Sequence, residues 1–270
     1  MEWLRGPAWI DNDRIVFDTT RATTYQPLTE PQLGIELARV HTEDEVVAFV
    51  RRYGLLQSKP EPTNVDGLLH EVVIFFLMNA YAVAGVLEWA VRLRQAAGGD
   101  STALSELRKG KTIPPESRYP IHKGGGLDTM ARADRLWVPD ERLVDADDRT
   151  VLMRSSERMA AYLNALLRGE DAGIQFVDRA AMGEDAPPTR WRLGMMPSTL
   201  LGACYLSVAL TLVDQKPIGI CAEPSCRRIY FIDDGRQRFC TATCANRARF
   251  KRYKERHGGA AKVPKEGNDG

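Results

Sequence analysis

Four cysteines near the C-terminus are the residues of this 270-residue chain with the clearest chemical potential. Four residues separate the members of the first pair, three separate those of the second, and thirteen lie between the pairs, which are Cys221, Cys226, Cys240 and Cys244. Two close pairs joined by a short loop supply the four thiolates of a tetrahedral Zn²⁺ site. Because thiolates fill all four positions, such a site is structural and has no place for a catalytic water. The alternative is four buried thiols without a metal, but clustered cysteines beside arginine and lysine are a poor core pattern.

The positive charge of the chain is concentrated in the same segment. Residues 221–257 hold ten Lys and Arg and four Asp and Glu, a net charge of +6, whereas residues 1–220 hold 25 basic and 30 acidic side chains, a net charge of −5. Phosphate backbones would attract this segment and not the acidic remainder. The side chains predicted to contact nucleic acid are Arg227, Arg228, Arg247, Arg249, Lys251, Arg252, Lys254 and Arg256.

A helix over residues 244–257 would arrange its cations in two stripes. One stripe consists of Arg249, Arg252 and Arg256, and the other of Arg247, Lys251 and Lys254. At about 100° per residue, Asn246, Phe250 and Tyr253 fill the sector between the stripes. Two basic stripes beside an aromatic strip suit a nucleic-acid groove; alternatively, the aromatic rings pack on the rest of the chain and one stripe meets phosphate. A solvated basic face and a protein-binding surface are the other interpretations. Asn246 either reaches base edges or braces the module.

The remaining cysteine and the apolar segments indicate a cytoplasmic protein. With five cysteines, four of them in one cluster, the chain fits a reducing compartment better than a disulfide framework. Cys204 is expected to be an inert buried thiol. The N-terminal residues lack the basic and apolar regions of a signal peptide. Residues 68–91 are apolar but contain His70, Glu71, Asn79 and Glu88, which are costly in lipid, so we predict a buried helix and no membrane partner.

The elements that must support the cysteine module are mostly helical. Helices are predicted over residues 42–54, 66–97, 101–108, 148–167 and 198–214, from apolar periodicity and capping signals. Strands are predicted over residues 14–18 and 32–40, with a hairpin over 174–177 and 189–193. The fold class is therefore α+β, a predominantly helical body with a small β-hairpin plus a C-terminal Cys₄ zinc-finger module. The irregular region 109–148 is predicted to be loops.

The residues around the cysteines resemble the CGNR zinc-finger family. The likeness runs through Cys226-Arg-Arg-Ile-Tyr-Phe231, Arg238-Phe-Cys240 and Cys244-Ala-Asn-Arg247. That family joins a C-terminal Cys₄ finger to an N-terminal ABATE domain, and the resemblance implies a stress-induced transcriptional regulator whose finger binds DNA. The name-giving glycine of the family is Ala245 here. Ala is better than Gly by about 1 kcal/mol in a helix but is strained at positive φ, and we predict the helical conformation.

The domain division follows from these patterns. Residues 1–215 form a mainly helical body that resembles the ABATE domain, whose early signature is distantly similar to Ile15-Val-Phe-Asp-Thr-Thr20. Residues 216–257 form the finger, and residues 258–270 form a disordered tail. The prediction is a DNA-binding regulator that is not an enzyme, with Zn²⁺ as its cofactor. The body would sense a small molecule or assemble, for example as a homodimer. The alternatives are a protein-interaction scaffold and an enzyme body that the finger delivers to nucleic acid. A single His70 beside Glu71 and the glycine run after His122 are too weak to predict further sites.

Overall fold

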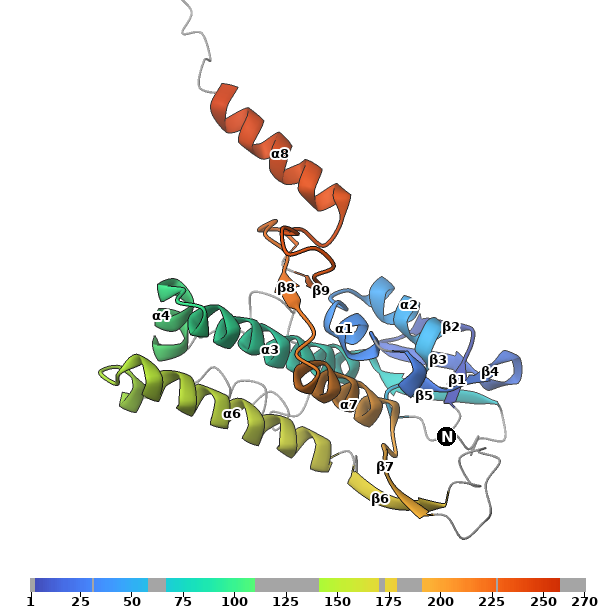
Figure 1. Cartoon of the computed structure of the whole chain (residues 1–270). Helices are drawn as coiled ribbons and strands as arrows, with labels where there is room; N and C mark the ends of the chain where they lie inside the picture. Colours follow the sequence, from blue (N-terminus) through green and yellow to red (C-terminus); the bar gives the residue numbers. More distant parts are fainter. Residues whose placement is uncertain are drawn as a thin grey trace, which may run out of the picture. The chain divides into compact units, whose positions relative to one another are not determined.

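The described part of the computed structural model, which covers residues 3–30, 32–57, 67–109, 141–169, 173–178, 191–226 and 228–257, forms two units. Met1–Lys216 is one compact unit, the body, and Pro217–Gly270 is the other, the finger unit (Figure 1). The described helices of the body are α1 (Leu33–Ala38), α2 (Glu43–Tyr53), α3 (Val73–Ala97), α4 (Ser101–Lys109), α6 (Asp148–Gly169) and α7 (Leu200–Val213), with 3₁₀ turns at Thr19–Arg21, Pro27–Thr29 and Glu141–Leu143. Its described strands are β1 (Trp3–Arg5), β2 (Ala8–Asp11), β3 (Arg14–Asp18), β4 (Thr23–Tyr25), β5 (Leu68–Val72), β6 (Gly173–Asp178) and β7 (Trp191–Met196).

Helix α3 is the centre of the body and contacts α1, α2, α4, α6 and α7. The indole N–H of Trp89, which is fully buried, donates to the carbonyl of Ser155 on α6 at 3.0 Å. The hydroxyl of Tyr205 on α7 donates to Asn79 Oδ1 at 2.9 Å, so the buried amide of Asn79 on this apolar helix is paired. By length and composition α3 could cross a membrane, the one such helix among the described residues, but 56% of its most apolar window is buried in the body. That burial favours the core helix predicted from the sequence.

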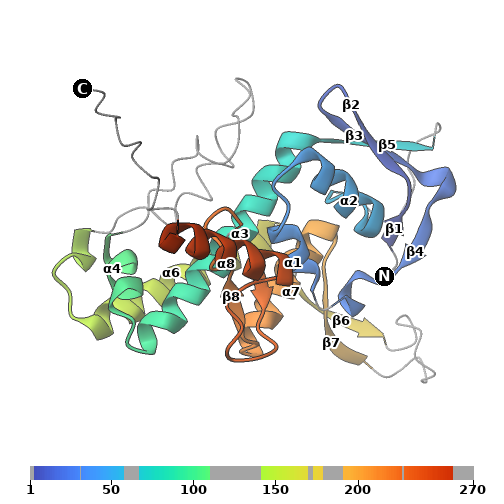
Figure 2. The same cartoon turned by 90° about the horizontal axis from the view of Figure 1, so that it is seen from above.

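The strands of the body form three small antiparallel sheets, β1–β4, β2–β3–β5 and β6–β7. Helix α2 lies against β1 and β2 (Figure 2). The strand predicted over residues 14–18 is β3, and the predicted hairpin is β6–β7, paired with Ile174 opposite Met195. Together with the helices, these sheets confirm the mixed α+β class with a helical body.

Two predictions for the body were wrong: one predicted strand is a helix, and one predicted helix begins later than expected. The alternating pattern over residues 32–40 predicted a strand, but the segment is α1. Its small residues are buried against other parts of the body. Position 34 must be glycine because a Cβ there would lie 2.8 Å from the carbonyl oxygen of Cys204 on α7. The long helix predicted from residue 66 begins only at Val73, since the preceding residues form β5 against β3.

Helix termini agree closely with the capping signals. Thr42 accepts a hydrogen bond from the Glu45 N–H, and α2 ends at Gly54, whose φ of +89° favours glycine. The predicted cap of α7 was Ser198, but the capping side chain is that of Thr199, which accepts from the Gly202 N–H at 3.0 Å. Most of the region 109–148, predicted to be loops, and the predicted tail 258–270 lie outside the described residues.

Asp18, at the end of β3, gives the body a pH-dependent contribution to stability. Its Oδ1 accepts hydrogen bonds from the hydroxyl and the N–H of Thr20, and its Oδ2 lies 2.7 Å from the Nε of Arg21. The Thr20 hydroxyl and then Arg21 lower the pKa of Asp18 to about 2. Because this is below the unfolded value of about 3.9, the carboxylate stabilises the fold above about pH 4, and the contribution disappears as the pH falls to about 2.

We therefore expect Asp18→Asn to unfold at lower urea concentration than the wild type at pH 7, with the difference closing between about pH 4 and pH 2. Urea midpoints measured across this range test the expectation. Asp11→Asn removes an exposed carboxylate from the neighbouring strand β2 and is the control. A difference between wild type and Asp18→Asn that stays constant down to pH 2 would contradict it.

Candidate metal centre and basic helix

Two short strands and one helix hold the four cysteines of the finger unit. Strands β8 (Ile218–Ile220) and β9 (Ile229–Phe231) pair antiparallel, and helix α8 (Ala242–His257) follows them. The first cysteine directly follows β8 and the second lies in the loop before β9. The third precedes α8 and the fourth lies in its first turn. Residues far apart in the sequence thus meet where the hairpin approaches the start of the helix.

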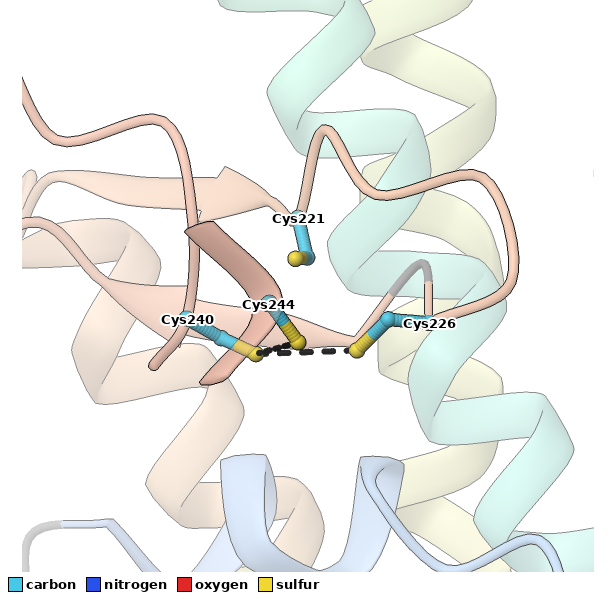
Figure 3. A group of neighbouring side chains, drawn as sticks. All are labelled: Cys221, Cys226, Cys240 and Cys244. Carbon is cyan, nitrogen blue, oxygen red and sulfur yellow. Dashed lines mark hydrogen bonds between the residues drawn. The ribbon is translucent and has the colours of Figure 1, made fainter. Parts of the chain in front are cut away.

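The four thiols converge on one point, as Figure 3 shows. All four Sγ atoms lie within 4.8 Å of one another. The Sγ of Cys240 is 3.6 Å from that of Cys226 and 3.7 Å from that of Cys244. A tetrahedral Zn²⁺ with Zn–S bonds of about 2.3 Å separates its sulfurs by about 3.8 Å. The geometry of these side chains therefore fits Zn²⁺, with Cys221, Cys226, Cys240 and Cys244 as its ligands and no position left for substrate.

Backbone hydrogen bonds fix the turns that present these thiols. The N–H of Cys221 donates to the Arg228 carbonyl and that of Cys226 to the Glu223 carbonyl, each at 2.9 Å, so the first pair sits in a closed knuckle. At the second pair, the Thr241 hydroxyl accepts from the Cys244 N–H at 3.2 Å and caps the start of α8.

The thiols differ in how readily they ionise. Burial raises the pKa of Cys226 and Cys240, whereas a hydrogen bond with the Thr241 side chain lowers the pKa of Cys244. Zn²⁺ binds thiolate, so occupation of the site releases the protons that burial retains.

A small core beneath the metal site includes residues that the sequence did not single out. Tyr230 is only 3% exposed, and its hydroxyl donates to the Gln237 carbonyl at 2.9 Å. The Gln237 side chain accepts from the Asp233 N–H and donates to the Phe239 carbonyl, which closes the loop after β9. A Cβ at Gly219 would come within 3.3 Å of the Tyr230 ring, so glycine opposite it in the hairpin allows the close approach. The signal available in the sequence was a Gly and a Tyr in two short apolar runs.

Helix α8 carries most of the predicted nucleic-acid contacts, and its surface is exposed around the helix. The exposed cations are Arg247, Arg249, Lys251, Arg252, Lys254 and Arg256. With Glu255 as its single acid, α8 has a net charge of +5. Within residues 228–257 no ion pair joins these cations to a carboxylate. The helix therefore presents positive charge that no described neighbour neutralises.

The other predicted contact residues lie off this helix or flank it. Arg228 is exposed beside the first knuckle, and Arg227 lies outside the described residues. Asn246 is exposed in the first turns of α8, and its side chain makes no hydrogen bond to the described residues. Ala245 lies in the first helical turns of α8, as the helical interpretation predicted, and positive φ is confined to other residues of the described chain.

The four cysteines converge where a strand hairpin meets the start of a helix, which is the arrangement of a structural Cys₄ zinc finger. Residues 218–257 match the model of the CGNR zinc finger family. This segment is therefore a CGNR zinc finger, the family that the sequence resembled, with Zn²⁺ as its metal. Among curated proteins, none matches the chain.

Proposed function

We propose that this protein is a DNA-binding transcriptional regulator, in which the finger unit contacts DNA and the body senses a ligand or assembles the protein. The observation that carries the proposal is helix α8, a helix of net charge +5 whose cations are all exposed and form no ion pair with a described carboxylate. A basic helix anchored by a structural metal site is a common means of reaching the phosphates and base edges of a groove.

The dimensions of α8 support this role. Its 16 residues extend about 24 Å. An α-helix is about 10–12 Å wide with its side chains, so it fits the major groove, which is about 12 Å across. The metal would act only by holding the first turn of the helix, because its ligand set is closed. The proposal accordingly includes no catalysis by the protein, and DNA is its principal partner.

The proposal gives residues 1–215 the regulatory part. In the same proposal, the body is ABATE-like, forms a homodimer and binds a small-molecule ligand. The acidic balance of this part of the chain supports the division, since it would repel phosphate and leave DNA contact to the finger unit.

Binding to DNA is expected to weaken steeply with salt, and the two stripes of α8 can be separated by mutation. One variant carries Arg249→Ala, Arg252→Ala and Arg256→Ala. If each removed side chain contacts one phosphate, the slope of log Kd against log salt falls by about 0.9 per residue, or about 2.7 in all. Alanine keeps the helix, so the change reports the lost charges. Fluorescence anisotropy of labelled duplex DNA across a salt series measures both slopes.

A second variant and one control locate the contact. The triple variant of Arg247, Lys251 and Lys254 to alanine shows whether both stripes meet phosphate or only one does. Arg154→Ala removes an exposed arginine of α6 in the body and should leave the slope unchanged. Salt-independent binding by the wild type would reject the proposal, and salt-resistant binding to a protein with none to DNA would favour the interaction scaffold.

A further inference from the structure

Two aromatic rings on α8 are exposed, whereas the other described Phe and Tyr rings of the finger unit are buried or half-buried. Phe250 and Tyr253 are each 60% exposed, whereas Tyr230 is 3% exposed and Phe239 packs against the core of the finger. Isolated exposed apolar residues are ordinary, but these two are three positions apart and therefore neighbours on one helical face. The finger core is complete without them.

The helix turns this pair of rings away from the metal site. At about 100° per residue, Phe250 and Tyr253 lie roughly 120° to 180° around the helix from Cys244, whose thiol faces the cluster. Both rings are thus on the outer side of α8 and have no route into the finger core.

Positive charge surrounds the two rings. The Nζ of Lys254 lies 4.9 Å from the centroid of the Phe250 ring, a cation–π contact that holds an ammonium group beside the ring. Arg249 directly precedes Phe250 and Arg252 directly precedes Tyr253, and neither arginine forms an ion pair with a described carboxylate. The surface that fits here is anionic and at the same time offers flat aromatic faces.

Unpaired nucleotides have both properties, and paired ones do not. In a continuous duplex the base faces are stacked on each other and only their edges are open. In a single strand each base presents a face to an aromatic side chain while its phosphate meets a cation, and one such stack contributes enough to change affinity by about tenfold. Charge complementarity and exposed rings on one helix together select this partner.

We propose that Phe250 and Tyr253 form a stacking platform for unpaired bases, so that the finger unit binds DNA containing a single-stranded stretch more tightly than a continuous duplex. The inference rests on the proposed DNA binding and deepens it. The basic stripes supply contacts to phosphate in either form of DNA, and the two rings supply the preference.

The test uses the full-length zinc-loaded protein and three labelled DNAs of the same sequence: a single strand, a duplex, and a duplex with a central unpaired bubble. The wild type is expected to bind the single strand and the bubble more tightly than the duplex. Phe250→Leu and Tyr253→Leu keep an apolar helix former but remove the π face. Each is expected to weaken binding to the single strand and the bubble by about tenfold and to change duplex binding by less than about twofold.

Three further variants keep the outcome specific. Phe250→Tyr and Tyr253→Phe retain a ring and should retain the preference. Trp9→Leu makes a similar change at an exposed ring of β2 in the body and should have no effect. Equal zinc content in all variants shows that the finger is intact.

The possible failures are distinguishable. If the wild type binds the duplex at least as well as the single strand, or if both leucine variants weaken all three DNAs equally, the stacking platform is wrong while DNA binding stands. If none of the DNAs binds at low salt, the proposed function fails together with it.

Discussion

Replacing Cys240 by serine is expected to remove zinc from the protein and abolish DNA binding while the body stays folded. The Sγ of Cys240 lies 3.6 Å from that of Cys226 and 3.7 Å from that of Cys244. A serine hydroxyl does not ionise at neutral pH and cannot replace a thiolate ligand. Zinc binding contributes on the order of 10–16 kcal/mol to the folding of small metal-dependent modules, far more than the few buried side chains of this finger provide.

Zinc content per chain, DNA affinity and thermal unfolding of the same preparations measure this result. The wild type should hold one Zn²⁺ and the variant close to none. Cys204→Ala is the matched control, because it also removes a buried thiol, but from α7 in the body. Full zinc occupancy in Cys240→Ser would refute the ligand assignment, and loss of the unfolding transition of the body would refute the independence of the two units.

Trp89→Ala is expected to produce the converse result, a strongly destabilised body with an intact finger. Trp89 is fully buried on α3, and its N–H donates to the Ser155 carbonyl on α6. The substitution leaves a cavity that costs about 3–5 kcal/mol and removes the indole hydrogen bond, which contributes about 0.5–1.5 kcal/mol more. Since domains are stable by about 5–15 kcal/mol, a large part of the stability of the body would be lost.

Urea unfolding followed by circular dichroism measures this loss, and zinc content reports on the finger. Trp9→Ala removes the same side chain from a site that is 39% exposed and should cost much less. Trp89→Phe refills most of the volume but not the hydrogen bond, so its cost separates the two contributions. A Trp89→Ala protein with wild-type stability, or one that loses zinc in proportion to the body, would contradict the expectation.

Local signals in the sequence were sufficient for the metal site and for most helix ends. Cysteine spacing identified a site whose chemistry depends on side chains a few residues apart, and the hairpin and the helix start then brought the two pairs together. Thr42 and Gly54 marked the ends of α2 because capping and positive φ are properties of single positions. The helical conformation at Ala245 followed in the same way from the preference of one residue type.

Features that depend on distant partners could not be predicted. Gly34 is small because α7, more than 160 residues later, packs against it, and without that neighbour the segment resembled an alternating strand. The strand β5 looked like the start of α3, since its apolar residues continue the run. What separates them is pairing with β3 and the Glu71 carboxylate, which accepts the N–H groups of Leu56 and Gln57. Neither partner is visible from the segment alone.

The exposure of α8 on all sides has a consequence for the helix–coil equilibrium of the finger. A helix gains little from propensity alone at this length, and forming its first turn is the unfavourable step, with a nucleation constant of about 10⁻³. In this finger the first turn contains Cys244 and is capped by Thr241, so metal coordination fixes the nucleus from which the remaining turns propagate. Zinc would thereby determine whether the residues after Cys244, as far as Arg256, are helical, although they are not its ligands. The metal would then act as a helix initiator, and the order of the basic surface would depend on its occupancy.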